Sequence, residues 1–464
     1  MGGSGDRQSH VNLRLRQDKS PGTDILSIVP YDFRRTRGGS PPMPTKARAF
    51  SPVTSQGVAP GRLDFMGGVA DYSGSLVLQS PIAATTRVAI TSRPDSQLVV
   101  TSTTPLAEFS CDFAPLLAAL HKRCDAANWR ALLIAVEAPG WAFYPLGCLW
   151  VFSRAKDWVP DGGLEFFIES DVPQALGVSS SAALEVATLR ALGHFSDTIF
   201  SGTEIARMGR EAENKIVGNP CGVEDQLASA FGRPGHLLPI VCRPDILLEA
   251  IRLPENIAVV GWAGSVRSDE ASAPFVQART AAFMGKKIFE TRGGQTFEHS
   301  SEIAPSTFVL HGDEFVPDRM TGREFEEKFG KTDDPCTTVD PETTYRVRSC
   351  LHFPIAENFR CQLAASLLRN FASPSGRKTL TLVGELMLQS HVGYTHIGLG
   401  SAECDKMVDA AMQLGPEKGI YGARISSGGA GGTVVVLAEK TSLPRLQKLA
   451  DQLKTGVGKL KLML

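Results

Sequence analysis

The alternation of apolar and polar residues becomes regular only from about residue 49. Apolar runs at residues 76–78 and 87–90 predict strands. Residues 1–48 contain many Gly, Ser, Pro and Arg residues and little periodic apolar signal, which indicates a disordered or adventitious tail. We therefore expect the folded part of the chain to begin near residue 49.

Two helices are predicted near the middle of the chain. Residues 181–192 are apolar at nearly every position, which is typical of a buried helix. Residues 204–216 have apolar residues at helical spacing, with Thr203 as the expected N-cap and Gly218 as the expected end. The stripe of this second helix consists of Ile205, Met208, Ala212 and Ile216.

Strand-like texture resumes at residues 253–260, where we place a domain boundary. The prediction is a tail over residues 1–48, a first domain over residues 49–255 and a second domain over residues 256–464. Within the second domain, residues 285–345 are charged and contain several Gly and Pro residues. They are expected to form an irregular insertion on the surface.

The rest of the second domain has clearer periodicity. Residues 355–372 and 378–389 favour helices, and residues 423–438 favour a strand, a glycine-rich turn and another strand.

Composition narrows the function classes. Hydrophobic residues make up 42% and charged residues 21% of the 464 residues, and the net charge is −1, so no global field draws the protein to nucleic acid or to an anionic membrane. The most apolar stretch, residues 131–152, is interrupted by Glu, Pro and Gly, which favours a buried segment over a membrane span. Nine dispersed cysteines without a Cys-x-x-Cys pair argue against a disulfide framework and a structural zinc site. With no apolar leader-like run near the start, we expect a cytoplasmic protein.

Three glycine-rich segments are the first candidates for chemistry. Residues 59–74 place glycines around Arg62, Asp64 and Asp71, where a backbone can approach a ligand closely. An arginine among apolar residues is rarely buried without a partner, so a strand–turn–strand with an ion pair is the plainer alternative. Residues 428–432 contain two glycine pairs before a buried strand, which indicates either a loop pressed against a ligand or a tight hairpin.

The remaining segment places a glycine and three serines directly before the apolar helix. The free N–H groups and positive end of such a helix form a natural phosphate site, and the hydroxyls suit phosphate or Mg²⁺. The segment lacks the Gly-Lys-Ser/Thr of a Walker A loop, and simple serine capping is the alternative. The residues concerned are Gly177, Val178, Ser179, Ser180 and Ser181.

Two acidic residues follow these serines. Glu213 lies at the edge of the stripe of its helix, and Asp225 lies in the first turn of the next short helix. A helix N-terminus stabilises a charged carboxylate, which makes Asp225 a weak general base or simply a first-turn aspartate. Phosphoryl transfer tolerates a weak base, because its loose transition state depends more on positioning and charge neutralisation.

The order and spacing of these segments resemble the three motifs of the GHMP kinases, the superfamily of galactokinase, homoserine kinase, mevalonate kinase and phosphomevalonate kinase. The resemblance extends from about residue 49 to about residue 440. Within the galactokinase-like branch, residues 60–79, 384–391 and 421–426 resemble the L-arabinokinases of plants.

The resemblance implies an α+β fold with two lobes, the first like ribosomal protein S5 domain 2 and the second ferredoxin-like. It implies ATP in the cleft with its phosphates on residues 177–181, and Mg²⁺ bound by Ser181 and Glu213. It identifies Asp225 as the catalytic aspartate and Arg62 as its partner. Sugar contacts are implied for Asp71, Gly222, Asp225 and Phe275.

The acceptor implied by the resemblance is L-arabinose, phosphorylated at its anomeric hydroxyl. Galactokinases have a Glu-His pair where this chain has Gly68 and Val69, and a pentose lacks the hydroxymethyl group that such a pair would bind. Three departures leave other readings open: Trp262, which would fill part of the sugar pocket, Ser268 in place of a histidine, and Phe275 in place of a tyrosine. The alternatives are a kinase for galactose or for a uronic acid, with Arg267 as the candidate cation, and a sugar or nucleotide sensor on the same scaffold.

The expected partners are the sugar and ATP, with no nucleic acid and no membrane, and the expected state is a monomer or weak homo-oligomer. A zinc enzyme is disfavoured, because His391 and His396 are five residues apart and do not share one face of a helix.

Overall fold

The computed structural model describes residues 55–219, 221–243, 245–263, 272–371 and 376–453, together with the short strand β14 (Leu462–Met463). These residues belong to one compact unit. The predicted tail over residues 1–48 lies outside the described residues.

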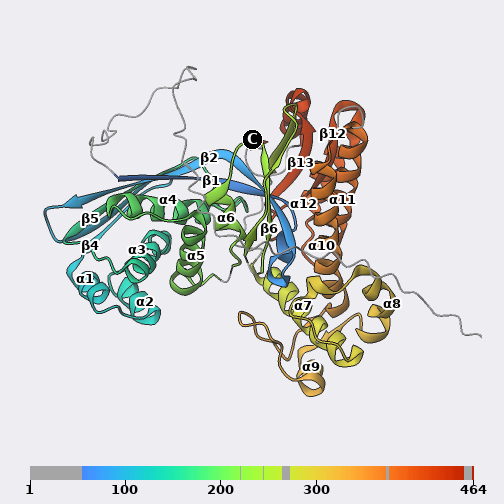
Figure 1. The fold of residues 1–464 in the computed structure, drawn as a ribbon, viewed down its shortest axis with the longest axis horizontal. Coiled ribbons are helices and arrows are strands. Elements are labelled where there is room, and N and C mark those ends of the chain that lie inside the picture. The colour runs from blue at the N-terminus through green and yellow to red at the C-terminus, as the bar shows by residue number, and fades with distance from the viewer. Residues whose placement is uncertain are drawn as a thin grey trace, which may run out of the picture. The chain divides into compact units, whose positions relative to one another are not determined.

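The first half of the described chain builds a mixed eight-stranded sheet in the order β4-β3-β5-β2-β6-β7, with β1 paired to β2 and β8 paired to β6. Only β3 and β5 are parallel partners. Figure 1 shows helices α1 to α5 on one side of this sheet. The strands are β1 (Ser55–Met66), β2 (Leu76–Arg93), β3 (Gln97–Thr103), β4 (Leu106–Asp112), β5 (Gly163–Ser170), β6 (His236–Val241), β7 (Ile246–Leu247) and β8 (Ile251–Arg252). The helices are α1 (Ala114–His121), α2 (Ala126–Ala135), α3 (Phe143–Lys156), α4 (Ser180–Phe195), α5 (Gly202–Ala212) and α6 (Glu224–Phe231).

The predicted strands at residues 76–78 and 87–90 are confirmed as two parts of the single strand β2. Its neighbour β1 shifts register between Pro60 and Arg62 and again between Asp64 and Met66. Such bulges bend a strand and redirect its side chains, and here they lie at the charged residues of the first glycine-rich segment.

Both middle helices are confirmed, with one correction. The helix predicted at residues 181–192 is α4, and the helix predicted at residues 204–216 is α5 followed by a π-helical turn (Glu213–Val217) that ends at Gly218 with φ +89°. Thr203 is not the cap of α5. The Ser201 hydroxyl accepts from the Glu204 N–H at 3.2 Å, and the Glu204 carboxylate accepts from the Ser201 N–H at 2.9 Å. This reciprocal pair makes Ser201 the N-cap.

The second half builds a four-stranded antiparallel sheet in the order β12-β13-β9-β14, with long helices packed against it (Figure 1). The helices predicted at residues 355–372 and 378–389 are confirmed as α10 and α11, and the predicted strand–turn–strand is confirmed as β12 and β13. The bounds are β9 (Ile257–Ala263), β12 (Ile420–Ile425), β13 (Thr433–Glu439), α7 (Ser272–Gly293), α10 (Val347–Arg369), α11 (Gly376–His396), α12 (Ala402–Leu414) and α13 (Leu443–Gln452). The expected boundary at residues 255 and 256 falls between β8 and β9, which belong to different sheets, and the domain limits stay a prediction.

The expectation of an irregular surface insertion over residues 285–345 is wrong. This segment contains the second half of α7 and the elements α8 (Pro305–Phe315), β10 (Met320–Thr321), α9 (Gly322–Phe329) and β11 (Thr344–Tyr345). It buries Phe289, Phe308 and Phe325 in the same core as α10. Most of its charged residues are exposed, with Lys286 and Asp334 as buried exceptions, so the many polar residues in the sequence obscured the apolar positions that form its core.

The apolar stretch over residues 131–152 ends in α3, whose residues 145–153 are all buried, as expected of a core segment. Within the described ranges, no helix is long and apolar enough to cross a membrane.

Candidate active site

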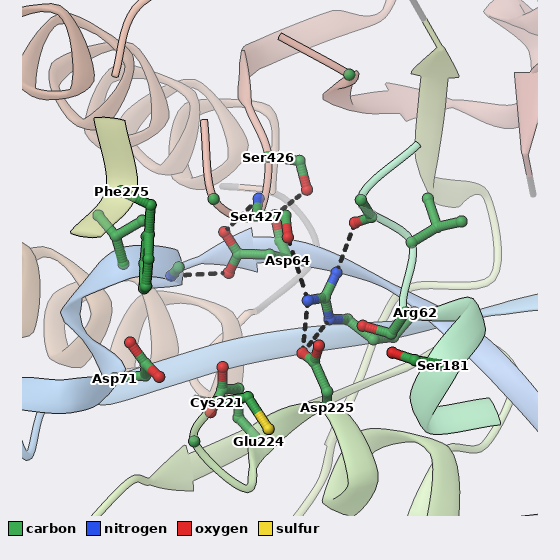
Figure 2. Close-up of a pocket in the computed structure, with 18 of the residues that line it drawn as sticks. Arg62, Asp64, Asp71, Ser181, Cys221, Glu224, Asp225, Phe275, Ser426 and Ser427 are labelled. Carbon is green, nitrogen blue, oxygen red and sulfur yellow. Dashed lines mark hydrogen bonds and ion pairs between the residues drawn. The ribbon is translucent and has the colours of Figure 1, made fainter. Parts of the chain in front are cut away.

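All three glycine-rich segments meet at one cavity of about 480 Å³ (Figure 2). The fold brings together at this cavity all the residues that were expected to bind phosphate, Mg²⁺ or sugar or to act in catalysis. Those residues are Arg62, Asp71, Gly177, Val178, Ser179, Ser180, Ser181, Glu213, Gly222, Asp225 and Phe275.

Arg62 joins the parts of the site. Its Nε donates to Asp225 Oδ1 at 2.8 Å, its Nη1 donates to the Gly177 carbonyl at 2.7 Å, and its Nη2 is 3.3 Å from Ser427 Oγ. The side chain is buried, and burial alone would lower the pKa of the guanidinium. The nearby carboxylates, Asp225 first, raise that pKa overall. A charged arginine is therefore fixed between β1, α6, the segment before α4 and the loop before β13.

Residues 177–181, which we call the serine loop, leave the N-terminus of α4 open. Gly177 and Ser179 have positive φ values of +71° and +55°, and Ser179 is the N-cap of α4 without a side-chain capping bond. Its buried hydroxyl has no hydrogen-bond partner among the described residues. Simple serine capping therefore does not explain this loop. The first N–H groups of α4 are available to an anion at the cavity.

Glu213 is positioned by the π-helical turn, a feature often found at functional sites. Its carboxylate accepts from Asn219 Nδ2 and from Gln226 Nε2, both at 2.8 Å, and from the Ser181 hydroxyl. Burial raises the pKa of Glu213 despite these hydrogen bonds. The Ser181 hydroxyl and the Glu213 carboxylate thus lie side by side, and both are oxygen ligands of the kind that hard cations prefer. The hydrogen-bond partners of Glu213 named above are neutral.

Glu185 adds a second buried carboxyl group behind Glu213, and sequence reasoning missed it. It shares the amide of Gln226, whose Nε2 is 2.9 Å from Glu185 Oε2. Burial, followed by the charge of Glu213, raises the pKa of Glu185 well above its usual range. Glu185 is the one acidic residue of α4 and lies among buried apolar residues of that helix. Its isolated charge in the apolar part of the helix could have identified it in the sequence.

Another part of the cavity lining is the carboxyl wall, which we define as Asp71, Gly222, Glu224 and Phe275. A Cβ on Gly222 would lie 2.3 Å from Glu224 Oε2 and 2.6 Å from Asp71 Oδ2, so a larger residue there would displace these carboxyl groups. Burial raises the pKa of Asp71 to about 6 and that of Glu224 well above its usual range. Phe275 packs edge-on against Tyr72 with ring centroids 6.2 Å apart. Figure 2 shows Asp71 and Glu224 on the same side of the cavity as Asp225.

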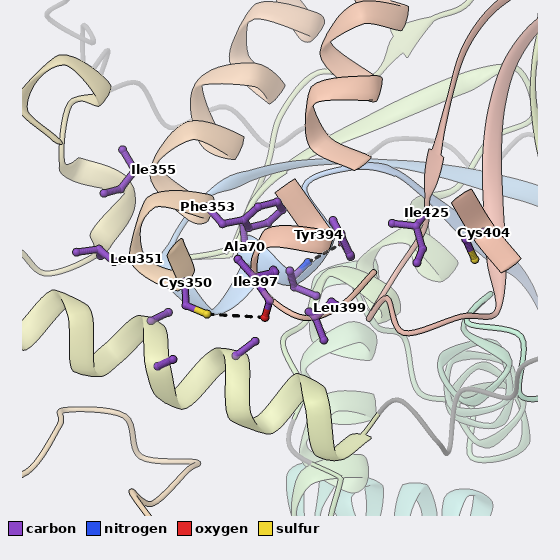
Figure 3. Packing of buried hydrophobic residues seen from close by; sticks show 14 of the residues in the cluster. Ala70, Cys350, Leu351, Phe353, Ile355, Tyr394, Ile397, Leu399, Cys404 and Ile425 are labelled. Carbon is purple, nitrogen blue, oxygen red and sulfur yellow. Dashed lines mark hydrogen bonds between the residues drawn. The ribbon is translucent and has the colours of Figure 1, made fainter. Parts of the chain in front are cut away.

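The loop at Gly68 is fixed by residues from the second half of the chain. A Cβ on Gly68 would lie 2.0 Å from the Tyr394 hydroxyl, which donates to the Ser427 carbonyl at 2.7 Å and accepts from the Val69 N–H at 3.3 Å. Ala70, the next residue, is buried in a core with Tyr394 (Figure 3). Gly68 and Val69 therefore present backbone and a small apolar side chain to the cavity.

Asp64 and Arg424 form a fully buried ion pair at the base of this loop, and sequence reasoning did not pair them. Arg424 Nη1 is 2.9 Å from Asp64 Oδ2, and Asp64 Oδ1 accepts from the Gly68 N–H at 2.9 Å. The two residues are 360 positions apart, so no local pattern connects them.

Three sequence expectations at the sugar end have different outcomes. Trp262 is fully buried in β9 and packs in the core of the second half, so the expectation that it fills the sugar pocket is wrong. Phe275 lines the cavity as expected. Ser268 and Arg267 lie outside the described residues.

His391 is a core histidine, as expected. Its Nε2 is 3.2 Å from Asp405 Oδ1, and its Nδ1 accepts from the Ile425 N–H at 3.3 Å. Burial lowers the pKa of this imidazole. In the described ranges, no group of three or more His, Cys, Asp or Glu side chains forms a metal site, a finding that does not address a site made by one serine and one carboxylate.

Comparison with known proteins identifies the fold. Residues 144–233 match the family model described as GHMP kinases N terminal domain, and residues 365–455 match GHMP kinases C terminal. The galactokinase of Lactococcus lactis, solved with galactose, is 19% identical, with a TM-score of 0.66 over 88% of this chain and 92% of that chain. The mevalonate kinase of Methanococcus jannaschii is 14% identical, with a TM-score of 0.56 over 89% of this chain and 97% of that one. The two-lobed α+β fold of the GHMP kinases is thus confirmed.

A curated relative is similar at the sequence level. The L-arabinokinase of Arabidopsis thaliana is 28% identical over 470 aligned positions, which cover 87% of this chain and 45% of the relative. The chain spans about half the length of this relative.

Proposed function

We propose that this chain, which belongs to the GHMP kinases, is an ATP-dependent sugar-1-kinase that phosphorylates the anomeric hydroxyl of L-arabinose. The observation that carries the proposal is the position of Arg62, which hydrogen-bonds the Asp225 carboxylate, the Gly177 carbonyl of the serine loop and Ser427 at the same cavity. This arrangement puts a candidate base, a fixed cation and an open helix N-terminus next to one another.

The serine loop is the proposed phosphate site. Its positive-φ backbone at Gly177 and Ser179 turns N–H groups toward the cavity, and the unpaired Ser179 hydroxyl adds a donor. ATP bound with Mg²⁺ would supply the phosphoryl group and the charge neutralisation that its transfer needs. Ser181 and Glu213 fit Mg²⁺ because both offer oxygen and the hydrogen-bond partners of Glu213 among the described residues are neutral.

In the proposed reaction Asp225 orients the acceptor hydroxyl and accepts its proton. Arg62 holds this carboxylate in place, and stabilises charge on the phosphoryl oxygens as they move toward the acceptor. The buried position of Arg62 at 4% exposure keeps water from screening this interaction.

The choice of L-arabinose rests on the wall at Gly68 and Val69 and on the likeness to the Arabidopsis relative. Tyr394 and Asp64 occupy the space that a side chain at position 68 would need, so residues 68 and 69 themselves offer no polar side chain to the sugar. A pentose needs none there. A uronic acid is disfavoured, because Asp71, Glu224 and Asp225 line the cavity and Arg62, the cation among the described lining residues, is already paired.

The decisive experiment is a coupled assay of ADP release with L-arabinose, galactose and galacturonate at equal concentrations. We expect the fastest turnover with L-arabinose, and a sugar 1-phosphate product identified by phosphorus NMR. Asp225→Ala is the inactive control, and Asp161→Ala, at an exposed position, is the matched control for loss of an aspartate. Faster turnover of galactose or galacturonate would overturn the choice of acceptor. ATP binding without any sugar phosphate product would instead support a sensor on the same scaffold.

A further inference from the structure

Asp71 and Glu224 bring two carboxyl groups to one point of the cavity from different parts of the chain. Asp71 lies in the short turn after β1, and Glu224 is the first residue of α6. One oxygen of each lies within 2.6 Å of the point where a Cβ on Gly222 would be. The absence of a side chain at position 222 is what allows the two groups to approach.

Each carboxyl group has a backbone hydrogen bond, but one oxygen of each is left without a partner among the described residues. Asp71 Oδ1 and Glu224 Oε2 are shielded from solvent and have no hydrogen-bond partner among the described residues. By contrast, Asp334, a buried carboxylate with a structural role, has hydrogen bonds to both oxygens. The oxygens of buried Asp334 accept from Arg279 Nε and Nη2 at 2.8 and 2.7 Å and from the Thr337 hydroxyl. Unpaired buried carboxyl oxygens that line a cavity are therefore candidates to bind a ligand.

The charges around the pair explain its protonation. Burial raises the pKa of both groups, and a neighbouring carboxylate raises it further, Asp225 acting on Asp71 and Asp71 acting on Glu224. At Asp71 this rise is opposed by Arg279, by a backbone hydrogen bond from Tyr72 and by Arg243. At Glu224 it is opposed by a hydrogen bond from its own backbone N–H and by Arg62, which is also paired with Asp225. Burial thus shifts both groups toward the protonated form, which lets one carboxyl of the pair donate a hydrogen bond while the other accepts one. The titratable and charged groups that act on the pair are Arg62, Cys221, Asp225, Cys242, Arg243 and Arg279.

We propose that Glu224 is a specificity-determining residue of the acceptor site and that, together with Asp71, it binds two neighbouring hydroxyl groups of a neutral sugar. This inference rests on the proposed sugar kinase function. Asp71 accepts from one hydroxyl, and the protonated Glu224 donates to the other. A sugar hydroxyl can fill either role, whereas a carboxylate of the ligand would meet the charge of Asp71.

The unpaired oxygens of Asp71 and Glu224 make the site more selective between sugars than the shape of the cavity alone would. A site whose buried polar groups need hydrogen bonds discriminates strongly against ligands that leave those groups unpaired. A deoxy sugar that lacks one of the two hydroxyls would leave Asp71 or Glu224 unsatisfied. The pair therefore selects for the presence of both hydroxyls.

The test compares three variants of the full chain. Glu224→Leu removes the hydrogen bond at similar size, Glu224→Gln keeps a donor and cannot titrate, and Glu255→Gln is the control for loss of an exposed glutamate. The readouts are calorimetric binding of L-arabinose, the KM and kcat for L-arabinose, and the KM for ATP. Thermal melting checks that each variant is folded.

We expect Glu224→Leu to raise the dissociation constant and the KM for L-arabinose by at least about tenfold, with the KM for ATP unchanged within about twofold. Glu224→Gln is expected to lose less than about fivefold. The sugar affinity of the wild type should fall as pH rises, because Glu224 then loses the proton that it donates. That fall should be absent in Glu224→Gln.

The outcomes separate this inference from the proposed function. Sugar binding that weakens in Glu224→Leu without turnover in the wild type would sink the kinase proposal and support this one. Turnover in the wild type with the same sugar affinity in Glu224→Leu would overturn this inference alone. A folded Glu224→Leu that loses ATP affinity as much as sugar affinity, or a Glu224→Gln with the pH profile of the wild type, would also overturn it.

Discussion

At the scale of single residues, the candidate site depends on buried charges that have defined partners. Arg62 has three acceptors from three segments, and Gly222 separates two carboxyl groups that no larger residue would allow to meet. Because these groups are removed from water, a small change in geometry leaves a charge or a polar atom unpaired, which is costly. Substitutions here should affect activity far more than their size suggests.

Arg62→Lys tests the planar guanidinium. A lysine keeps the charge but cannot reach Asp225, Gly177 and Ser427 at once, because its ammonium is a single point on a flexible chain. We expect kcat to fall by at least about tenfold, with a smaller change in the KM for the sugar. Steady-state kinetics measure this, with exposed Arg252→Lys as the matched control. A kcat within about twofold of the wild type would contradict the role given to the fork of Arg62.

Gly222→Ala tests the close approach at the carboxyl wall. The added methyl group would lie 2.3 Å from Glu224 Oε2 and 2.6 Å from Asp71 Oδ2, so both carboxyl groups must move. The KM for the sugar should rise by at least about tenfold while the KM for ATP stays nearly constant. Gly140→Ala is the matched control, because a Cβ there meets nothing within 4 Å. Equal effects of the two substitutions on sugar KM would rule out a specific effect at position 222.

At the scale of elements, local signals set where helices begin and end, and the same signals position site residues. α5 begins at a capping box of Ser201 and Glu204 and continues into the π-helical turn that holds Glu213. α4 begins at Ser179 without a side-chain cap, which leaves its N–H groups open toward the cavity. The N-terminus of α5 is capped by side chains, whereas that of α4 is uncapped and lies where we expect a ligand.

Ser201→Ala tests the cap of α5 against Thr203→Ala as its control. Losing the Ser201 hydroxyl should cost about 0.5–2 kcal/mol of unfolding free energy, whereas Thr203→Ala should have almost no effect. Urea denaturation followed by circular dichroism measures both. A larger loss with Thr203→Ala would restore the cap expected from the sequence and contradict the capping box at Ser201.

The same capping box predicts a pH dependence. Hydrogen bonds from Ser201, together with Lys156, lower the pKa of Glu204 to about 2. A depressed folded-state pKa means that this contribution is fully present above the unfolded pKa of about 4.5 and is lost as pH falls through about 2. Glu204→Gln should therefore flatten part of the fall in melting temperature over that acidic range. An unchanged acid profile would contradict this assignment.

At the scale of the whole molecule, residues from both halves of the chain share one core and one polar network. Leu63 and Phe65 of β1 pack with Val435 and Leu437 of β13. The buried pair of Asp64 and Arg424 lies beside this contact and supports the loop at Gly68. The two halves are therefore expected to unfold together rather than one after the other.

Asp64→Asn tests this shared network. It leaves the Arg424 guanidinium buried without a charged partner, which should lower the unfolding free energy by about 3–5 kcal/mol. Exposed Glu255→Gln, which breaks a surface pair, should cost less than about 1 kcal/mol. Guanidinium denaturation measures the unfolding free energy of both variants, and an unchanged m value shows that the comparison is valid. A loss at Asp64 as small as at Glu255, or two separate transitions in the wild type, would contradict a shared network.

The local parts of this protein could be recognised in its amino-acid sequence. A helix N-terminus, a positive-φ glycine and an apolar stripe are properties of a few neighbouring residues, so the serine loop, α4, Glu213 and Asp225 stood out from their local patterns. The family likeness added the order of the motifs and therefore the fold.

Which residues face one another depends on the packing of distant segments. The pairs of Asp64 with Arg424 and of Asp71 with Glu224, the burial of Trp262 and the core beneath residues 285–345 all arise from contacts of this kind. Periodicity reports that a side chain is buried but not what lies against it. The free energy of a buried charge depends on its partner, so the electrostatics of this site became visible only once segments distant in the sequence were packed together.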